Sequence, residues 1–496
     1  MNYSFEQKTF IALSKNANKK ALVGSDLTLT WTDFKNEVEK LLALFAHLNI
    51  PKGHPVLIYG HKEAHFIVAK TALMIYGCPY VPADIIFPLE RIKMMQEECQ
   101  SEVLINCTHD NRLNDSFSII ITLPSFDYKQ FHEISSTLNH LTTVDNPIIY
   151  VLFTSGSTGR PKGVPITEKG VNSLANWIST SFFIDQNDIL LNVSALSFDF
   201  ASFEEFLFLT LGNTLILAKN EEIKSSEKLL EKIQKEQVSV WVSTPSLVYM
   251  YLMEPLFCAQ DLPSIKSFVF AGESLPLRTV QKLKERFPKA KIWNAYGPTE
   301  ATNLTAAVEL STELIESHGA IPIGFSKPES EIILLNPDAE GVGEICIIGD
   351  HVTNGYLNND VLNAEKFFTY NEKKAYKSGD LGFFKDNLLF YAGRNDEMVK
   401  LHGYRIELDD ISSQIKSFEK VNNASTIGLK NKGETKKIVS FFTSNEKLSV
   451  EEINLFLRKN LPEYMLPSEI IQLENIPLNV SDKVDKKMLE QIYFNR

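Results

Sequence analysis

The sequence predicts an α/β protein with a large N-terminal α/β body, a β-rich subdomain and a small C-terminal α+β domain. Short strand-like runs alternate with amphipathic helical segments up to about residue 330. Such alternation is typical of layered folds with largely parallel strands. After about residue 332, strands follow one another across tight polar turns. The length of 496 residues leaves room for more than one domain.

The N-terminal body contains the clearest periodic segments. Over 31–48, apolar residues recur at steps of three and four, which indicates an amphipathic helix. Further helices are predicted over 65–76 and 277–287. Strands are predicted over 55–60, 80–82, 102–106, 238–242, 267–270 and 291–294.

Two later regions complete the predicted layout. Strands over 331–335, 344–348 and 387–391 have no long helices between them and indicate the β-rich subdomain. The polar segment 393–396 favours a boundary, with the N-terminal core over 1–394 and the C-terminal domain over 395–496. In that last domain we expect helices over 408–417 and 450–460, and strands over 438–442 and near 470.

Composition and charge exclude several classes of protein. The chain is 44% hydrophobic and 23% charged, which argues against disorder and against a coiled coil. Its net charge of −12 disfavours duplex nucleic acid as the main partner. Apolar stretches are too short or too interrupted to span a membrane, and no signal peptide is visible. The five cysteines lack metal-site spacing, so we expect a cytoplasmic protein with reduced thiols.

A Gly-Ser-Thr segment directly follows an apolar strand and predicts a phosphate-binding loop. Its glycines allow backbone N–H groups to point inward, its hydroxyls add donors, and its lysine adds charge. It is not a Walker loop, because its lysine lacks the flanking Gly and Ser/Thr. The predicted phosphate-binding residues are Thr154, Ser155, Gly156, Ser157, Thr158, Gly159 and Lys162.

Further motifs occur in order along the chain. Residues 294–300 read Asn-Ala-Tyr-Gly-Pro-Thr-Glu, 376–380 read Tyr-Lys-Ser-Gly-Asp, and 393–407 read Gly-Arg-Asn-Asp-Glu-Met-Val-Lys-Leu-His-Gly-Tyr-Arg-Ile-Glu. Together with the loop, these motifs resemble those of the adenylate-forming superfamily, which includes acyl-CoA synthetases, luciferases and amino-acid adenylation domains. The resemblance extends over essentially the whole chain.

The resemblance implies an ATP- and Mg²⁺-dependent reaction in which a carboxylate attacks the α-phosphorus of ATP. It implies that Tyr296 lies against adenine, Asn294 faces its edge, Asp380 binds the ribose, and Arg394 lies beside the nucleotide. Thr299 would hold the α-phosphate, and Glu300 would hold Mg²⁺ and act as the metal ligand. Other residues assigned to the nucleotide site by resemblance are Gly272, Glu273, Ala295 and Gly297.

Two residues of the C-terminal part have roles implied by the resemblance. Lys483 is similar to the lysine that bridges the carboxylate and the α-phosphate, although Ser481-Asp482 replaces the usual Asn-Gly before it. Asp396 lies where the superfamily has its hinge. Rotation about it would bring 401–406 to the site, where a thiol attacks the acyl-adenylate.

The residue at 199 indicates the substrate class. In amino-acid-adenylating members, an aspartate at this point binds the substrate's α-ammonium group, and a buried carboxylate is favourable beside such a cation. Asp199 as a helix N-cap is the alternative reading. The residues that would line the pocket are Phe200, Phe203, Val242, Val269, Ala271, Ala295, Asn303 and Leu304. None of these residues is charged and could pair with an acidic or basic side chain of the substrate, so we expect a small neutral amino acid.

The sequence is most similar to the family of D-alanine–carrier-protein ligases, through 240–248, 285–292 and 400–405. Ala271 replaces the cysteine of that family, so the amino acid and its chirality stay open. The resemblance implies a free-standing enzyme whose partner is a separate carrier protein bearing phosphopantetheine. The alternatives are an acyl-CoA synthetase for a small carboxylic acid, an adenylating enzyme of nonribosomal peptide synthesis, and a non-catalytic scaffold with a decayed site.

Overall fold

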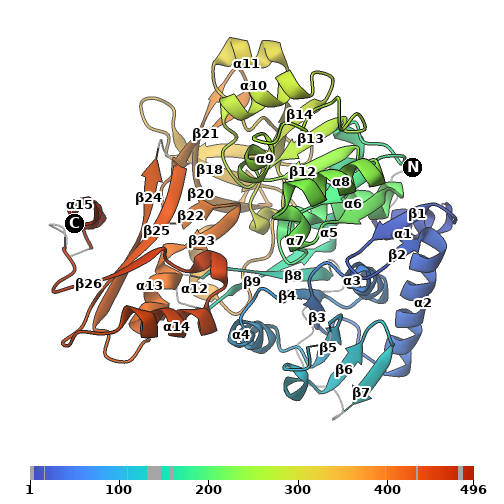
Figure 1. Cartoon of the computed structure of the whole chain (residues 1–496), viewed down its shortest axis with the longest axis horizontal. Coiled ribbons are helices and arrows are strands. Elements are labelled where there is room, and N and C mark those ends of the chain that lie inside the picture. Colours follow the sequence, from blue (N-terminus) through green and yellow to red (C-terminus); the bar gives the residue numbers. More distant parts are fainter. Residues whose placement is uncertain are drawn as a thin grey trace. The chain divides into compact units, whose positions relative to one another are not determined.

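Figure 1 shows a computed structural model of the chain, which describes residues 5–15, 17–108, 110–130, 147–156, 160–396, 398–431, 434–478 and 484–496. The chain divides into two compact units. Unit 1 comprises Met1–Asp84, Cys99–Leu152 and Val164–Asn395, and unit 2 comprises Ile85–Glu98, Phe153–Gly163 and Asp396–Arg496. The boundary predicted between 394 and 395 stays a prediction, but unit 2 also takes in the Gly-Ser-Thr loop.

A nine-stranded sheet in unit 1 carries five of the predicted site residues, Val242, Val269, Asn294, Ala295 and Tyr296. Its order is β16-β15-β14-β13-β12-β10-β11-β1-β2. The strands are β1 (Lys20–Val23), β2 (Thr28–Thr30), β10 (Ile189–Asn192), β11 (Thr214–Leu217), β12 (Val240–Ser243), β13 (Ser267–Phe270), β14 (Lys291–Tyr296), β15 (Ala306–Glu309) and β16 (Phe325–Ser326). Strands β1, β11, β10, β12, β13 and β14 pair in parallel. Their carboxyl ends therefore share one edge, where ligands of open α/β sheets bind.

A second sheet has the order β7-β6-β5-β3-β4-β8-β9. Its strands are β3 (Val56–Gly60), β4 (Tyr80–Asp84), β5 (Val103–Asn106), β6 (Ile119–Thr122), β7 (Asp127–Gln130), β8 (Ile148–Thr154) and β9 (Lys162–Thr167). Strands β4, β3, β5 and β6 pair in parallel. Because helices cover such strands on both faces, they are apolar throughout, and β3 and β5 are fully buried.

One hydrophobic core joins both sheets to helices α1 (Phe5–Lys15), α2 (Trp31–His47), α3 (Ala64–Tyr76), α5 (Glu168–Ser181) and α6 (Ser202–Leu211). Helix α2 begins with a capping box, in which Thr30 and Asp33 satisfy each other's backbone N–H groups. The other face of the nine-stranded sheet packs against helices α8 (Ser226–Glu236), α9 (Pro245–Tyr251) and α10 (Leu277–Arg286), as Figure 1 shows. Short helices α7 (Asn220–Ile223), α11 (Thr312–His318) and α12 (Asp360–Lys366) lie in connecting segments.

The predicted β-rich subdomain is confirmed as an antiparallel sheet in unit 1. It contains β17 (Glu331–Leu335), β18 (Gly343–Ile348), β19 (Phe367–Tyr370), β20 (Lys373–Lys385) and β21 (Leu388–Arg394). The last of these strands delivers Arg394 opposite Asp380 of β20.

Unit 2 has its own α+β core. A hairpin of β22 (Met398–Leu401) and β23 (Tyr404–Glu407) turns through His402 and Gly403, both with positive φ, as a tight two-residue hairpin turn requires. The remaining elements are α4 (Leu89–Cys99), α13 (Leu408–Lys416), β24 (Asn423–Asn431), β25 (Glu434–Thr443), α14 (Val450–Asn460), β26 (Glu469–Leu473) and α15 (Lys486–Phe494). Among the described helices, none is long and apolar enough to cross a membrane.

Candidate active site

Asp199 lies just beyond the carboxyl end of β10, at the start of the short 3-10 helix η2 (Asp199–Ala201). Its carboxylate accepts a hydrogen bond from the Thr299 hydroxyl. The cap position of η2 is Phe198 and carries no side-chain cap hydrogen bond. Asp199 is therefore not the N-cap of η2. Its carboxylate instead contacts Thr299, the residue predicted to hold the α-phosphate.

Asn303 ties the two segments of this site together. Its amide nitrogen donates to the Asp199 carbonyl at 2.9 Å and to the Ser202 hydroxyl at 2.9 Å. Thr302 and Asn303 both have positive φ, at 57° and 66°. Non-glycine residues in the left-handed region cluster at functional sites, because the surrounding contacts must offset the strain.

Glu300 lies in the short helix η3 (Thr299–Ala301) and is fully buried. The Tyr356 hydroxyl donates to its Oε1 at 2.7 Å, and the hydroxyls of Tyr356 and Tyr376 lie 3.4 Å apart. This carboxylate is therefore oriented by a tyrosine that the sequence analysis did not identify.

Tyr296, Asp380 and Arg394 form a second cluster in unit 1. The Tyr296 hydroxyl donates to Asp380 Oδ2 at 2.8 Å, and the Arg394 guanidinium donates to Asp380 Oδ1 and to the Ser378 carbonyl. Burial, and then the negative charge of Asp380, raises the pKa of Tyr296 well above its usual range, so its hydroxyl stays a donor. Three of the residues predicted for the nucleotide thus lie together.

Other residues predicted for the nucleotide contact the protein backbone. The Asn294 amide donates to the Pro322 carbonyl at 2.7 Å. Glu273 accepts a hydrogen bond from the Ser246 N–H at 3.0 Å, in the first turn of α9. Gly297 passes so close to the 303–304 backbone that an added Cβ would lie 2.0 Å from the Asn303 carbonyl oxygen, which excludes any side chain there.

The predicted pocket residues are all buried. Except for Asn303, they belong to the core cluster that joins the two sheets, and they are Phe200, Phe203, Val242, Val269, Ala271, Ala295 and Leu304. Phe203 is fully buried, with its ring centroid 5.1 Å from that of Phe182. Ala271 follows the carboxyl end of β13 and precedes Gly272, whose φ is +88°.

The Gly-Ser-Thr loop is held by residues of β23 and α13, all within unit 2. Ser155 Oγ donates to the Arg405 carbonyl and accepts from the Glu407 N–H, each at 3.1 Å. The Gly156 N–H donates to Asp410 at 3.4 Å, and Lys162 Nζ lies 3.2 Å from Glu407 Oε1. The Gly156 N–H and the Lys162 ammonium therefore each contact a carboxylate, which is an anion like the phosphates that they are predicted to bind.

Several predicted residues lie outside the described part of the chain: Ser157, Thr158, Gly159, Ser481, Asp482 and Lys483. Asp396, the predicted hinge, is described, and its Oδ1 accepts from the Met398 N–H at 3.3 Å. Its role in rotation stays a prediction.

Asp410 should make stability depend on pH. Burial raises the pKa of this carboxyl to about 6. At this site the folded chain therefore binds a proton more tightly than the unfolded chain, so the contribution of Asp410 to stability is greatest below about pH 4 and is lost as pH rises through about 6. We expect Asp410→Asn to remove this loss and to stabilise unit 2 at neutral pH by about 3 kcal/mol at most. Urea denaturation of the wild type and the variant between about pH 4 and pH 7 measures this difference in the free energy of unfolding.

The control for that experiment is Asp409→Asn, which changes the exposed neighbour on the same helix. Its pH profile should follow the wild type. Equal profiles for Asp410→Asn and the wild type would contradict the assignment.

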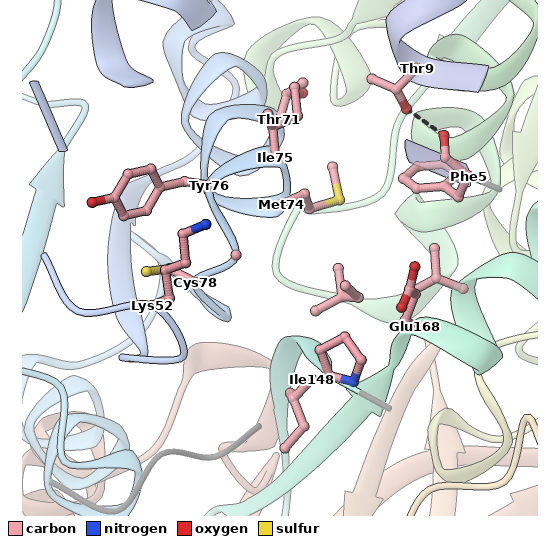
Figure 2. Close-up of a pocket in the computed structure, with 14 residues that line it drawn as sticks. Phe5, Thr9, Lys52, Thr71, Met74, Ile75, Tyr76, Cys78, Ile148 and Glu168 are labelled. Atoms are coloured by element: carbon pink, nitrogen blue, oxygen red, sulfur yellow. Dashed lines mark hydrogen bonds between the residues drawn. The ribbon is translucent and has the colours of Figure 1, made fainter. Parts of the chain in front are cut away.

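A cavity of about 190 Å³ lies among α1, α3, the start of β8 and α5, as Figure 2 shows. Its wall includes Phe5, Met74 and Glu168, and the Thr9 hydroxyl donates to the Phe5 carbonyl at 3.0 Å. None of the residues predicted for the site lines this cavity. It therefore lies apart from the candidate active site.

Comparisons with known proteins identify the family. A family model described as AMP-binding enzyme matches residues 10–357. The chain belongs to the AMP-binding enzyme family. The resemblance to adenylate-forming enzymes is thereby confirmed.

Two curated relatives of this AMP-binding enzyme carry the name D-alanine–D-alanyl carrier protein ligase. The relative from Bacillus licheniformis is 32% identical, with 95% of this chain and 96% of the relative covered. The relative from Listeria welshimeri is 33% identical, with 93% of this chain and 94% of the relative covered.

Two solved structures share the fold. The Vibrio cholerae adenylation domain AlmE, in complex with glycyl-adenosine-5'-phosphate, has a TM-score of 0.86 at 21% identity and covers 100% of this chain and 98% of its own. The o-succinylbenzoate CoA synthetase of Bacillus subtilis has a TM-score of 0.83 at 20% identity, with 98% of each chain covered. The predicted fold class is confirmed.

Proposed function

We propose that the chain is an AMP-forming ligase that activates a small neutral amino acid, D-alanine or a similar one, as an aminoacyl-adenylate. It then transfers the aminoacyl group to the phosphopantetheine thiol of a separate carrier protein. The observation that carries this proposal is the Asp199 carboxylate, which contacts Thr299 beside the carboxyl ends of the parallel strands. The names of the relatives support the same reaction.

In the first step, a carboxylate oxygen of the amino acid forms a bond to the α-phosphorus of ATP, and the bond to the β-phosphate breaks with release of pyrophosphate. Negative charge shifts onto phosphate oxygens, so fixed donors lower the barrier. Thr299 would donate to the α-phosphate, and Lys483 would bridge it to the substrate carboxylate. The Gly-Ser-Thr loop and Lys162 would hold the departing phosphates.

The remaining nucleotide contacts come from the cluster in unit 1. Tyr296 would lie against adenine, and Asp380 would accept the ribose hydroxyls while Arg394 holds it in place.

Mg²⁺ fits the residues present. In nucleotide sites this ion is usually held by one or two carboxylates together with phosphate oxygens and water. Glu300 is a buried carboxylate next to Thr299 and is oriented by Tyr356. Bound with ATP, Mg²⁺ would neutralise phosphate charge. We place the reaction in the cytoplasm, where ATP is available and the five free cysteines stay reduced.

In the second step, the thiol loses its proton and its sulfur attacks the carbonyl carbon of the adenylate. The bond from this carbon to the phosphate oxygen breaks, which gives the thioester and releases AMP. The test combines the enzyme, ATP, D-alanine and a holo carrier protein, and measures the mass of the carrier. We expect aminoacylation of the holo carrier but not of the apo carrier. Transfer to coenzyme A alone would favour the acyl-CoA synthetase instead.

Ala271 provides a prediction about chirality. It directly follows the carboxyl end of β13 and belongs to the same core cluster as the apolar residues predicted for the pocket, so a larger side chain there would narrow the pocket. We expect Ala271→Cys to change the ratio of kcat/KM for the two alanine enantiomers by about tenfold, since one methyl-sized contact contributes about 1–3 kcal/mol. Pyrophosphate release with each enantiomer measures this ratio. An unchanged ratio would show that position 271 does not select the enantiomer.

A further inference from the structure

Two lysines are buried beneath the segment that leads to Asp199. Lys62 follows β3, and Lys70 lies in the middle of the apolar helix α3; their exposed fractions are 1% and 4%. Lysine is almost never buried without partners, because removing an ammonium group from water is costly. The contacts of both lysines should therefore reveal a specific role.

Both ammonium groups hold the connection between β10 and η2. Lys62 Nζ donates to the Asn192 side-chain oxygen and to the Ser194 carbonyl. Lys70 Nζ donates to the Leu196 carbonyl at 2.7 Å. The two lysines thus engage the backbone at positions 194 and 196, three to five residues before Asp199.

The same lysines are anchored to helix α6, which begins directly after η2. Lys70 Nζ lies 2.9 Å and 3.0 Å from the two carboxylate oxygens of Glu205. Asn192, which accepts from Lys62, donates to Glu204 Oε1 at 3.1 Å. Glu204 and Glu205 are also buried. Asp199 therefore lies between two segments that the lysines contact. The backbone at Ser194 and Leu196 precedes it, and helix α6 follows it.

The charge state of the network agrees with this geometry. Burial lowers the pKa of Lys70, and Glu205 counters part of that shift. Burial raises the pKa of Glu204 well above its usual range, while the hydrogen bond from Asn192 and the charge of Lys62 act in the opposite direction.

We propose that Lys62 and Lys70 are positioning residues for the amino-acid substrate: they fix the Ser194 and Leu196 carbonyls and thereby set where the Asp199 carboxylate stands. We call this pair the lysine clamp. The inference rests on the proposed function, in which Asp199 binds the substrate ammonium. The lysines themselves do not touch the substrate.

The test replaces the ion pair as a whole. Removing one partner of a buried pair leaves an uncompensated charge, whereas replacing both with apolar side chains of similar size is often close to neutral. We therefore use Lys70→Met with Glu205→Met. We expect this double variant to raise the KM for the amino acid about tenfold or more, with the KM for ATP changed less than about twofold.

The chain offers a matched control. Lys232 Nζ donates to the Leu217 carbonyl at 3.0 Å and to the two Glu222 carboxylate oxygens at 3.0 and 2.8 Å. Like Lys70, it thus contacts one backbone carbonyl and both oxygens of one glutamate, but at the end of strand β11. Lys232→Met with Glu222→Met should leave both KM values unchanged. We call Lys70→Met with Glu205→Met the clamp variant. If it raised the KM for the amino acid and the KM for ATP equally, or left both unchanged, the positioning role would be wrong.

A second measurement separates the clamp from the proposed function. Hydrogen–deuterium exchange of the full chain should rise in peptides covering 193–201 in the clamp variant, and should not rise there in the control variant. If the wild type releases no pyrophosphate with any amino acid, the proposed function fails, while exchange in 193–201 still decides whether the lysines fix this segment. Unchanged exchange there would overturn the clamp.

Discussion

Asp199→Ala should lower kcat/KM for the amino acid about a hundredfold or more while ATP binding is retained. The carboxylate would no longer be present to balance the substrate ammonium, and truncating one partner of a buried charge pair costs about 2–5 kcal/mol. Thr299 would also lose its partner beside the site. Amino-acid-dependent pyrophosphate release measures the loss, and binding of ATP is followed separately.

The control is Asp185→Ala. Asp185 precedes the opposite, amino end of strand β10 and pairs with Lys266 at 3.5 Å. It should leave activation of the amino acid unchanged. Full amino-acid activation by Asp199→Ala would remove the main argument for an amino-acid substrate and would favour the acyl-CoA synthetase.

The second large effect is expected for Asp380→Ala, on both stability and ATP use. Arg394 donates to Asp380 and has a side chain only 9% exposed, so the variant would leave a buried guanidinium without its carboxylate. Such a loss destabilises a protein by about 3–5 kcal/mol. The ribose hydroxyls would lose their acceptor as well. We therefore expect a lower melting temperature and a KM for ATP raised at least tenfold, by about 1.4 kcal/mol or more.

Two further variants separate these effects. Asp386→Ala changes an exposed aspartate in the turn between β20 and β21, whose side chain is 73% exposed, and should leave the KM for ATP unchanged. Tyr296→Phe removes only the hydroxyl that donates to Asp380 and should affect ATP less than Asp380→Ala. A normal KM for ATP in Asp380→Ala would exclude the ribose role.

Local patterns in the sequence predicted the regular elements well. The period of apolar residues over 31–48 corresponds to α2, which ends at His47, and the predicted helix over 277–287 corresponds to α10, which ends at Arg286. Periodicity finds such elements because each presents one apolar face to the core. Helix α15 was not predicted. Its apolar face is short and polar residues surround it.

The partners of the site residues were harder to predict. Motifs placed Asp199, Thr299, Tyr296 and Asp380 in the chain, but the sequence gives no distance between residues a hundred positions apart. The structure brings Asp199 to Thr299. Tyr356 was missed, because a lone tyrosine carries no signal of its contact with Glu300.

Charged residues in apolar segments were the signal that could have revealed the lysine clamp. Lys70 is a lone charge in an otherwise apolar helix, and such a residue needs a buried partner. Glu204 and Glu205 are two carboxylates within the apolar run of α6. Their sequence spacing does not identify which lysine pairs with which glutamate, because that depends on how the helices pack.

Carboxylates facing the Gly-Ser-Thr loop were also missed. Glu407 is the last residue of the 393–407 motif and Asp410 lies three residues beyond it, and they contact Lys162 and Gly156 in unit 2. Acidic residues on a helix are usually solvated, so nothing in the sequence distinguished Asp410 from its exposed neighbour.

The most direct test of the account is amino-acid-dependent pyrophosphate release by the purified protein with ATP and Mg²⁺. The substrates are D- and L-alanine, glycine, serine, proline and several short fatty acids. We expect release with one or more small neutral amino acids and none with the fatty acids. Release with a fatty acid, and with no amino acid, would contradict the role of Asp199 and the proposed function with it.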